Sequence, residues 1–240
     1  MDSKMINIII EALGQTIYMV FFSTLFASVL GFILGIIVTV TSPTGLRPNI
    51  FIYKSLDVII NVLRSFPFII LIVFIIPLTR AIVGTPIGET AAIVPLTIAA
   101  APFVARIIES ALKEVDPGVI EAAKSFGASN LQIIFKVMLK EAVPAIISGL
   151  TLTIINIIGY SAMAGSVGAG GLGKVAISYG YQRYQTDVMI VTVIILIIIV
   201  SVMVYKFSKI NKFSLYINIP YIVWLLYALF LNYFIWIINK

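Results

Sequence analysis

The sequence contains no cysteine and no histidine among its 240 residues. Without cysteine there are no disulfides and no thiolate metal sites. Without histidine there is no Ser–His or Cys–His catalysis and no histidine-ligated zinc or haem. The remaining residue types offer no spacing typical of a nucleophile–base pair or a metal site. We therefore expect a protein that is not an enzyme and that holds no metal or cofactor of its own.

Charged residues are also scarce. They make up 11% of the chain, whereas a soluble domain usually carries about a quarter, and 61% of the residues are hydrophobic. A lipid bilayer is the solvent that suits this composition, so the sequence predicts an integral membrane protein. The net charge of +6 does not indicate nucleic-acid binding, because the basic residues are spread between apolar blocks.

Five apolar stretches are each long enough to cross a bilayer as a helix, which takes about 20 residues. Polar, turn-rich segments separate these stretches. The pattern predicts an all-α integral membrane fold, a bundle of five core transmembrane helices within residues 11–207. The expected spans are residues 13–40, 57–78, 90–108, 145–164 and 188–205.

A sixth apolar stretch, residues 215–238, lies in a C-terminal extension formed by residues 208–240. It is long enough to span, but Pro220 and Asn232 interrupt its apolar character. Two interpretations stay open: a sixth transmembrane helix, or a tail that lies at the membrane interface.

Charge distribution predicts the topology, because basic residues gather on the cytoplasmic side of membrane proteins. If the polar segment 109–144 lies in the cytoplasm, most of the Lys and Arg residues fall on that side. We therefore expect a cytoplasmic central segment and an N-terminus outside.

Two of the expected spans contain residues that a plain lipid-facing helix avoids. Arg64 lies near the start of the second span, where it can extend to the interface, and Pro67 is expected to kink that helix. Arg106 and Glu109 are spaced to form an ion pair on one helix face near the end of the third span.

The central segment predicts two short helices with a break between them. Asp116 is suited to cap the first, Pro117 to occupy its first position, and Gly127 to end it in the left-handed conformation. Ser129 and Gln132 have the spacing of a capping box that restarts the chain. The first helix carries Val119, Ala123 and Phe126 on one face, and so is typical of a helix that enters another protein's groove.

The fourth span is unusually polar, which indicates a helix facing other helices or a water-filled path. Met163 is a large flexible side chain among small ones, and near a dimer axis it would suit a gate; ordinary packing is the alternative. The candidate path residues are Asn156, Tyr160, Ser161 and Met163.

Glycines cluster at two places. Gly31 and Gly35 form a G-x-x-x-G, which indicates either close helix packing or merely the high glycine content of membrane helices. The run after the fourth span matches G-x-G-x-x-G, but it follows a membrane helix and not a buried strand, so nucleotide binding is not expected. We interpret it as a flexible or tightly turned outer cap formed by Gly165, Gly168, Gly170, Gly171 and Gly173.

A family resemblance rests first on the central segment. Glu121-Ala122-Ala123, followed after three residues by Gly127, resembles the EAA loop of ABC-transporter permeases, which lies in the cytoplasm and docks on the ATPase subunit. Lys140 stands where the family usually has a proline after Leu139, so the backbone conformation at Lys140 is not predicted by the resemblance.

Four further blocks are similar to the methionine-uptake permeases of the ABC importers, over roughly residues 11–207. Residue 215 onward has no counterpart in that family, whose members usually have five spans. The blocks are residues 64–71, 76–80, 91–97 and 159–173.

The resemblance implies a homodimer with the path on its two-fold axis, and two ATPase subunits, which bind the ATP and Mg²⁺, docked on residues 121–127. It also implies an outer methionine-binding protein that delivers the substrate. An ABC importer for another amino acid or small solute is the main alternative. An ion-coupled carrier is less favoured, because such carriers use a histidine or carboxylate inside the membrane, and here the acidic residues lie at predicted span ends or loops.

Overall fold

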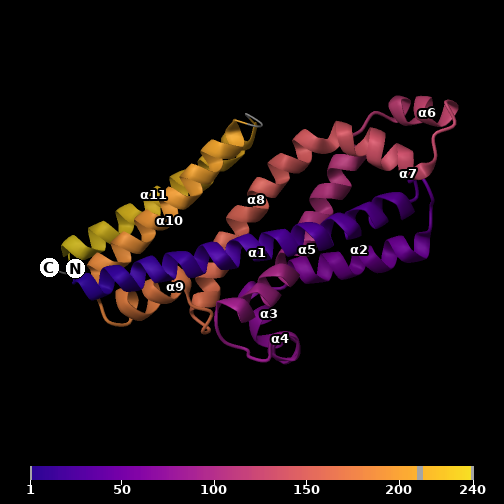
Figure 1. Cartoon of the computed structure of the whole chain (residues 1–240). Coiled ribbons are helices and arrows are strands. Elements are labelled where there is room, and N and C mark those ends of the chain that lie inside the picture. The colour runs from indigo at the N-terminus through magenta and orange to yellow at the C-terminus, as the bar shows by residue number, and fades with distance from the viewer. Residues whose placement is uncertain (1, 210–212, 239–240) are drawn as a thin grey trace.

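The computed structural model describes residues 2–209 and 213–238, and every regular element within these residues is a helix. Figure 1 shows an elongated bundle in which α1 (Ser3–Thr41) runs nearly the length of the molecule. The N-terminal end of α1 lies at one end of the bundle, and the short helix α6 (Pro117–Ser125) lies at the other. The predicted all-α fold is confirmed.

The third predicted span forms α5 (Glu89–Lys113), which packs along α1 and also against α8 (Leu139–Gly165). The G-x-x-x-G of α1 makes this contact. A β-carbon on Gly31 would lie 2.5 Å from Val104 Cβ, and one on Gly35 would lie 2.6 Å from Ile108 Cβ. Of the two interpretations of these glycines, close helix packing is therefore the one found in the fold.

The second predicted span, residues 57–78, is corrected. It begins earlier, as α2 (Ile50–Ser65), because the Asn49 side chain accepts a hydrogen bond from the Ile52 N–H and caps the helix. It then breaks at Phe66–Pro67, and the chain continues as α3 (Phe68–Phe74), bent from α2 by 108°. A third short helix, α4 (Ile76–Val83), follows. The kink expected at Pro67 is a complete break, because the pre-proline residue leaves the helical region.

The helical segment that contains the fourth predicted span, residues 145–164, begins well before Ala145. α7 (Asn130–Gln132), a π-helical stretch η1 (Ile133–Met138) and α8 form one continuous helical segment. Pro144 lies inside α8, and the Ser148 hydroxyl donates a hydrogen bond of 3.0 Å to the Pro144 carbonyl. Membrane helices tolerate such prolines when side chains and local π-helical turns satisfy the freed backbone groups. Lys140 lies in regular α-helix, which settles the backbone at that position.

The C-terminal part contains α9 (Gly171–Val175), a π-helical stretch η2 (Ala176–Tyr181), α10 (Thr186–Ser208) and α11 (Phe213–Ile238). Among the described residues, four helical segments are each long and apolar enough to cross a bilayer, and the bent α2–α3 pair makes up to five.

α11 packs against α10 (Figure 1). Its apolar stretch in the described part, Asn218–Leu231, is shorter than a full span. The sixth span over residues 215–238 stays a prediction. Residues 210–212 and 239–240 of the expected extension lie outside the described residues.

Candidate coupling helix and translocation cleft

Local side-chain chemistry defines both ends of α6 as predicted. The Asp116 carboxylate accepts a hydrogen bond of 2.7 Å from the Gly118 N–H, and Pro117 occupies the first helical position. Gly127 has a φ of +76°, the left-handed conformation expected of it. The capping box is present, with the Ser129 hydroxyl and the Gln132 side chain each bonded to the other residue's backbone N–H. These contacts make α6 a rigid, well-bounded helix.

The two faces of α6 differ sharply. Ile120 and Ala123 pack against the apolar cluster at the ends of α5 and η1. Val119, Ala122 and Phe126 are exposed, and the Phe126 side chain is 91% exposed. The helix period places Ala123 on the same side as Val119 and Phe126, as predicted. Ala123 lies at the inner edge of that side and is half-buried against the apolar cluster, whereas Ala122 is exposed.

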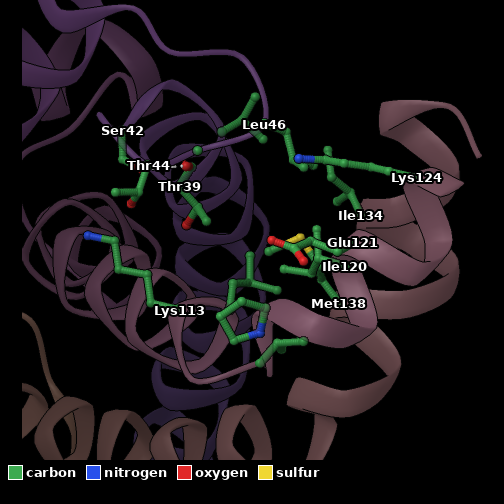
Figure 2. A pocket seen from close by; sticks show the side chains of 15 residues that line it. Thr39, Ser42, Thr44, Leu46, Lys113, Ile120, Glu121, Lys124, Ile134 and Met138 are labelled. Atoms are coloured by element: carbon green, nitrogen blue, oxygen red, sulfur yellow. Dashed lines mark hydrogen bonds between the residues drawn. The ribbon is translucent and has the colours of Figure 1, made fainter.

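A cavity of about 300 Å³ lies between α6, the end of α5, η1 and the loop after α1. Figure 2 shows the Glu121 carboxylate pointing into this cavity beside Ile120 and Met138, while the Lys124 side chain extends toward Leu46. Glu121 and Lys124 therefore also face the permease itself. A few apolar side chains pack α6 against the membrane-spanning helices, and the cavity lies beside these contacts. α6 can therefore shift relative to those helices.

A charged cluster joins α2 to α5. The Arg106 guanidinium bonds to the carboxylates of Asp57 and Glu109 and, at 2.9 Å, to the Asn61 side-chain oxygen. The Lys113 ammonium lies 2.6 Å from the other oxygen of Glu109. The predicted Arg106–Glu109 pair is confirmed. Asp57 could not be predicted from sequence, because the contact links residues on two different helices.

One face of α8 lines a cleft against α2, α3 and α5. Two adjoining cavities of about 560 and 190 Å³ share Arg64 and Phe103. The residues of α8 that line them recur every three or four positions, which is the period of one helix face. They are Ala145, Ser148, Gly149, Leu152, Thr153, Asn156 and Tyr160. The Tyr160 ring stacks on Phe68 of α3, with centroids 4.6 Å apart.

Met163 and Ser161 lie on different sides of α8. Met163 follows Tyr160 by three residues, continues the same face, and is 50% exposed. Ser161 is buried, and its hydroxyl donates a hydrogen bond of 2.7 Å to the Ile158 carbonyl. The hydroxyl donor of Ser161 is used within the helix, and its role as a path residue stays a prediction.

The glycine run is tightly turned and clamped by α1. The Gln15 side-chain oxygen accepts a hydrogen bond of 2.8 Å from the Gly171 N–H, and the Thr16 hydroxyl accepts one of 2.9 Å from the Leu172 N–H. The Gly88 N–H donates to the Gly168 carbonyl at 3.0 Å.

Space and backbone conformation both demand glycine in this run. Gly168, Gly170 and Gly171 have positive φ. A β-carbon on Gly165 or Gly173 would collide with the backbone of the facing segment. The run follows the helix α8, not a strand, so its context remains unlike that of a nucleotide-binding loop.

Comparison with known proteins identifies the family. Residues 29–210 match the model of the "Binding-protein-dependent transport system inner membrane component". The chain belongs to this family. It is accordingly a multi-pass transport subunit of the inner membrane and not an enzyme.

The permease is 52% identical over 186 residues to the "Probable D-methionine transport system permease protein MetI" of Vibrio cholerae, covering 78% of this chain and 83% of that one. It is 46% identical over 165 residues to the "D-methionine transport system permease protein MetI" of Escherichia coli K12, covering 69% and 76%.

The permease also resembles a chain in a solved structure described as "Inward facing conformations of the MetNI methionine ABC transporter". The TM-score is 0.86 at 43% identity, with 89% of this chain and 99% of that chain covered. The family match ends at residue 210, just before α11 begins.

Proposed function

We propose that this permease forms the translocation path of an ATP-driven importer for methionine. The observation that carries the proposal is α6, a capped helix at the end of the bundle whose Phe126 side chain is 91% exposed. A rigid helix that presents an exposed aromatic residue to water suits a partner's groove. The relatives named as D-methionine permeases, at 46–52% identity, support methionine as the substrate.

Charge and geometry support the proposed orientation. Lys124, Lys136 and Lys140 surround the α6 end of the bundle, and basic residues favour the cytoplasmic side. α1 carries the N-terminus to the opposite end (Figure 1). α6 therefore lies in the cytoplasm, and the N-terminus and the glycine cap lie outside.

The working assembly has two copies of this chain, two ATPase subunits and an outer binding protein that delivers methionine. Each ATPase receives one α6 helix, contacting Ala122 and Phe126, while Gly127 sets the turn that presents them. The ATPase binds the ATP and Mg²⁺, and this chain contributes no cofactor. Closure of the ATPase pair draws the two α6 helices together, and the apolar contacts of Ile120 and Ala123 pass the motion to α5 and η1.

The cleft face of α8 forms each subunit's part of the path. Asn156 and Tyr160 line it, and Met163 follows at its outer end. Met163 and its copy close the path when the outer side is shut. The glycine cap, clamped by Gln15 and Thr16, holds the outer end of α8 in place.

The test is uptake of radiolabelled methionine into proteoliposomes containing the permease, its ATPase and the binding protein, with and without ATP. Gly127→Ala is the coupling variant and Gly84→Ala its matched control. Both glycines have positive φ, +76° and +85°, and space for a β-carbon, but Gly84 ends α4, far from α6. The left-handed conformation costs alanine about 1–2 kcal/mol at either site.

We expect ATP-dependent uptake that Gly127→Ala lowers about fivefold to thirtyfold and Gly84→Ala retains. ATP hydrolysis without methionine uptake, together with uptake of a different amino acid in a competition series, would favour the alternative substrate. Uptake driven by an ion gradient without ATP would contradict the proposal as a whole.

A further inference from the structure

Arg64 lies beside the middle of α5, a helix long and apolar enough to cross a membrane. α2 begins at Ile50, so Arg64 is in its last turn and not near its start, and its guanidinium lies 5.6 Å from the centre of the Phe103 ring. Phe103 precedes the end of α5 at Lys113 by about ten residues, or about 15 Å of helix. The expectation that Arg64 reaches the interface stays a prediction.

Arg64 differs from the other arginine nearby. Arg106 has two carboxylate partners, Asp57 and Glu109. In residues 2–209 and 213–238, the contact found for Arg64 is the Phe103 ring, and no carboxylate lies within ion-pair distance of it. Intramembrane arginines without a partner are rare and mark substrate or ion pathways. The balancing anion is then expected to come from a ligand.

The surroundings of Arg64 fit a small amphiphilic molecule. Arg64 is shared by the cavity of about 560 Å³, which extends to Glu114 and Ala145, and the cavity of about 190 Å³, which extends to Tyr160. The smaller cavity also carries the Asn156 amide and the stacked rings of Phe68 and Tyr160. A carboxylate suits the planar guanidinium, and a thioether packs well against aromatic rings.

We propose that Arg64 binds the α-carboxylate of the transported amino acid beside the middle of α5, with the apolar side chain against Phe68 and Tyr160. The proposal rests on the proposed function and adds a binding site within the path. The paired N–H groups of the planar guanidinium orient the substrate. The substrate carboxylate supplies the anionic partner that Arg64 lacks among the described residues. Asn156 presents an amide oxygen that accepts from the substrate ammonium group.

The test uses the complete importer in proteoliposomes, with ATP hydrolysis and methionine uptake measured in the same preparation. The variants are Arg64→Gln and Arg64→Lys, with Arg80→Gln as the control. Arg80 is an exposed arginine on α4, outside the cleft.

For Arg64→Gln we expect binding-protein-stimulated ATP hydrolysis to continue while uptake falls roughly tenfold to a hundredfold, the factor typical of a lost charge-assisted hydrogen bond. Uptake by Arg64→Lys should fall severalfold, because lysine keeps the positive charge but not the planar, paired donors of arginine. Arg80→Gln should keep most of the uptake.

Wild-type uptake in Arg64→Gln would overturn the site, and so would an equal loss in Arg80→Gln, which would show that the loss does not depend on the cleft. If Arg64→Gln does not assemble, Arg64→Lys is decisive, and wild-type uptake in that variant overturns the site. A wild-type importer that takes up no methionine overturns the proposed function itself, and this outcome differs from a failure confined to the Arg64 variants.

Discussion

Gly31 of α1 lies so close to Val104 of α5 that a β-carbon on Gly31 would come within 2.5 Å of Val104 Cβ and 2.6 Å of the Ala101 carbonyl oxygen. Gly35 repeats the contact one turn later, against Ile108 and Ala105. Small residues let membrane helices approach closely and gain dispersion contacts over a long interface. This contact aligns the longest helix of the bundle with its most buried one.

Gly31→Val should therefore destabilise the permease. Inserting side-chain atoms into a packed interface costs about 1–3 kcal/mol, which should lower the melting temperature of the purified protein by several degrees. Gly14→Val in the same helix is the control, because a β-carbon on Gly14 meets nothing within 4 Å. Equal melting temperatures for the two variants would show that α1 and α5 are not held at Gly31.

Glu109 is the centre of the α2–α5 charge cluster, with a side chain only 5% exposed between Arg106 and Lys113. Glu109→Gln leaves Arg106 with the Asp57 carboxylate as its one anionic partner and removes the carboxylate that pairs with Lys113. Removing one partner of a buried ion pair costs up to 3–5 kcal/mol, and we expect about 2 because Asp57 and Lys113 are partly exposed.

Thermal unfolding in detergent measures this loss, with Glu114→Gln as the control. Glu114 follows α5 and its side chain is exposed. A melting temperature unchanged by Glu109→Gln would mean that the cluster does not stabilise the fold.

Phe126 is expected to dominate binding of the ATPase subunit. Buried aromatic anchors in interfaces cost about 2 kcal/mol or more when truncated, so Phe126→Ala should weaken the permease–ATPase complex at least about thirtyfold. Tyr181→Ala is the control, since Tyr181 is an exposed aromatic residue at the end of η2, far from α6. Co-purification and equilibrium binding in detergent provide the measurement, and unchanged affinity in Phe126→Ala would exclude the exposed face of α6 as the docking surface.

Met163→Ala should open the outer end of the cleft. Without the large side chain, proteoliposomes preloaded with labelled methionine should lose it faster without ATP, and ATP hydrolysis should become less dependent on the binding protein. Ile198→Ala serves as the control, because Ile198 is a similarly exposed apolar residue on α10. Identical leak rates in the two variants would mean that Met163 only packs.

Sequence patterns predicted the structure correctly where the contacts that determine it join residues close together in the chain. Asp116, Pro117, Gly127 and the Ser129–Gln132 capping box act within a few residues of one another, and each has the predicted conformation or bond. The Arg106–Glu109 pair lies within one turn of helix and was predicted for the same reason.

The predictions failed where they depended on the exact start of a helix or on which side of a helix faces its neighbours. The Asn49 cap starts α2 at Ile50, which places Arg64 in the last turn of that helix and not near its start. The burial of Ser161 and the partial burial of Ala123 were not predicted, because residue type alone does not show which side of a helix its neighbours cover.

Composition and local spacing thus sufficed to establish a membrane helix bundle with a capped, projecting helix, since lipid solvation and hydrogen bonds near in sequence govern both. The pairing of Asp57 with Arg106, the clamp of Gln15 on Gly171 and the cleft around Arg64 depended on tertiary packing. Each joins residues far apart in the chain, and only the assembled helices bring them within the range of hydrogen bonds and charge.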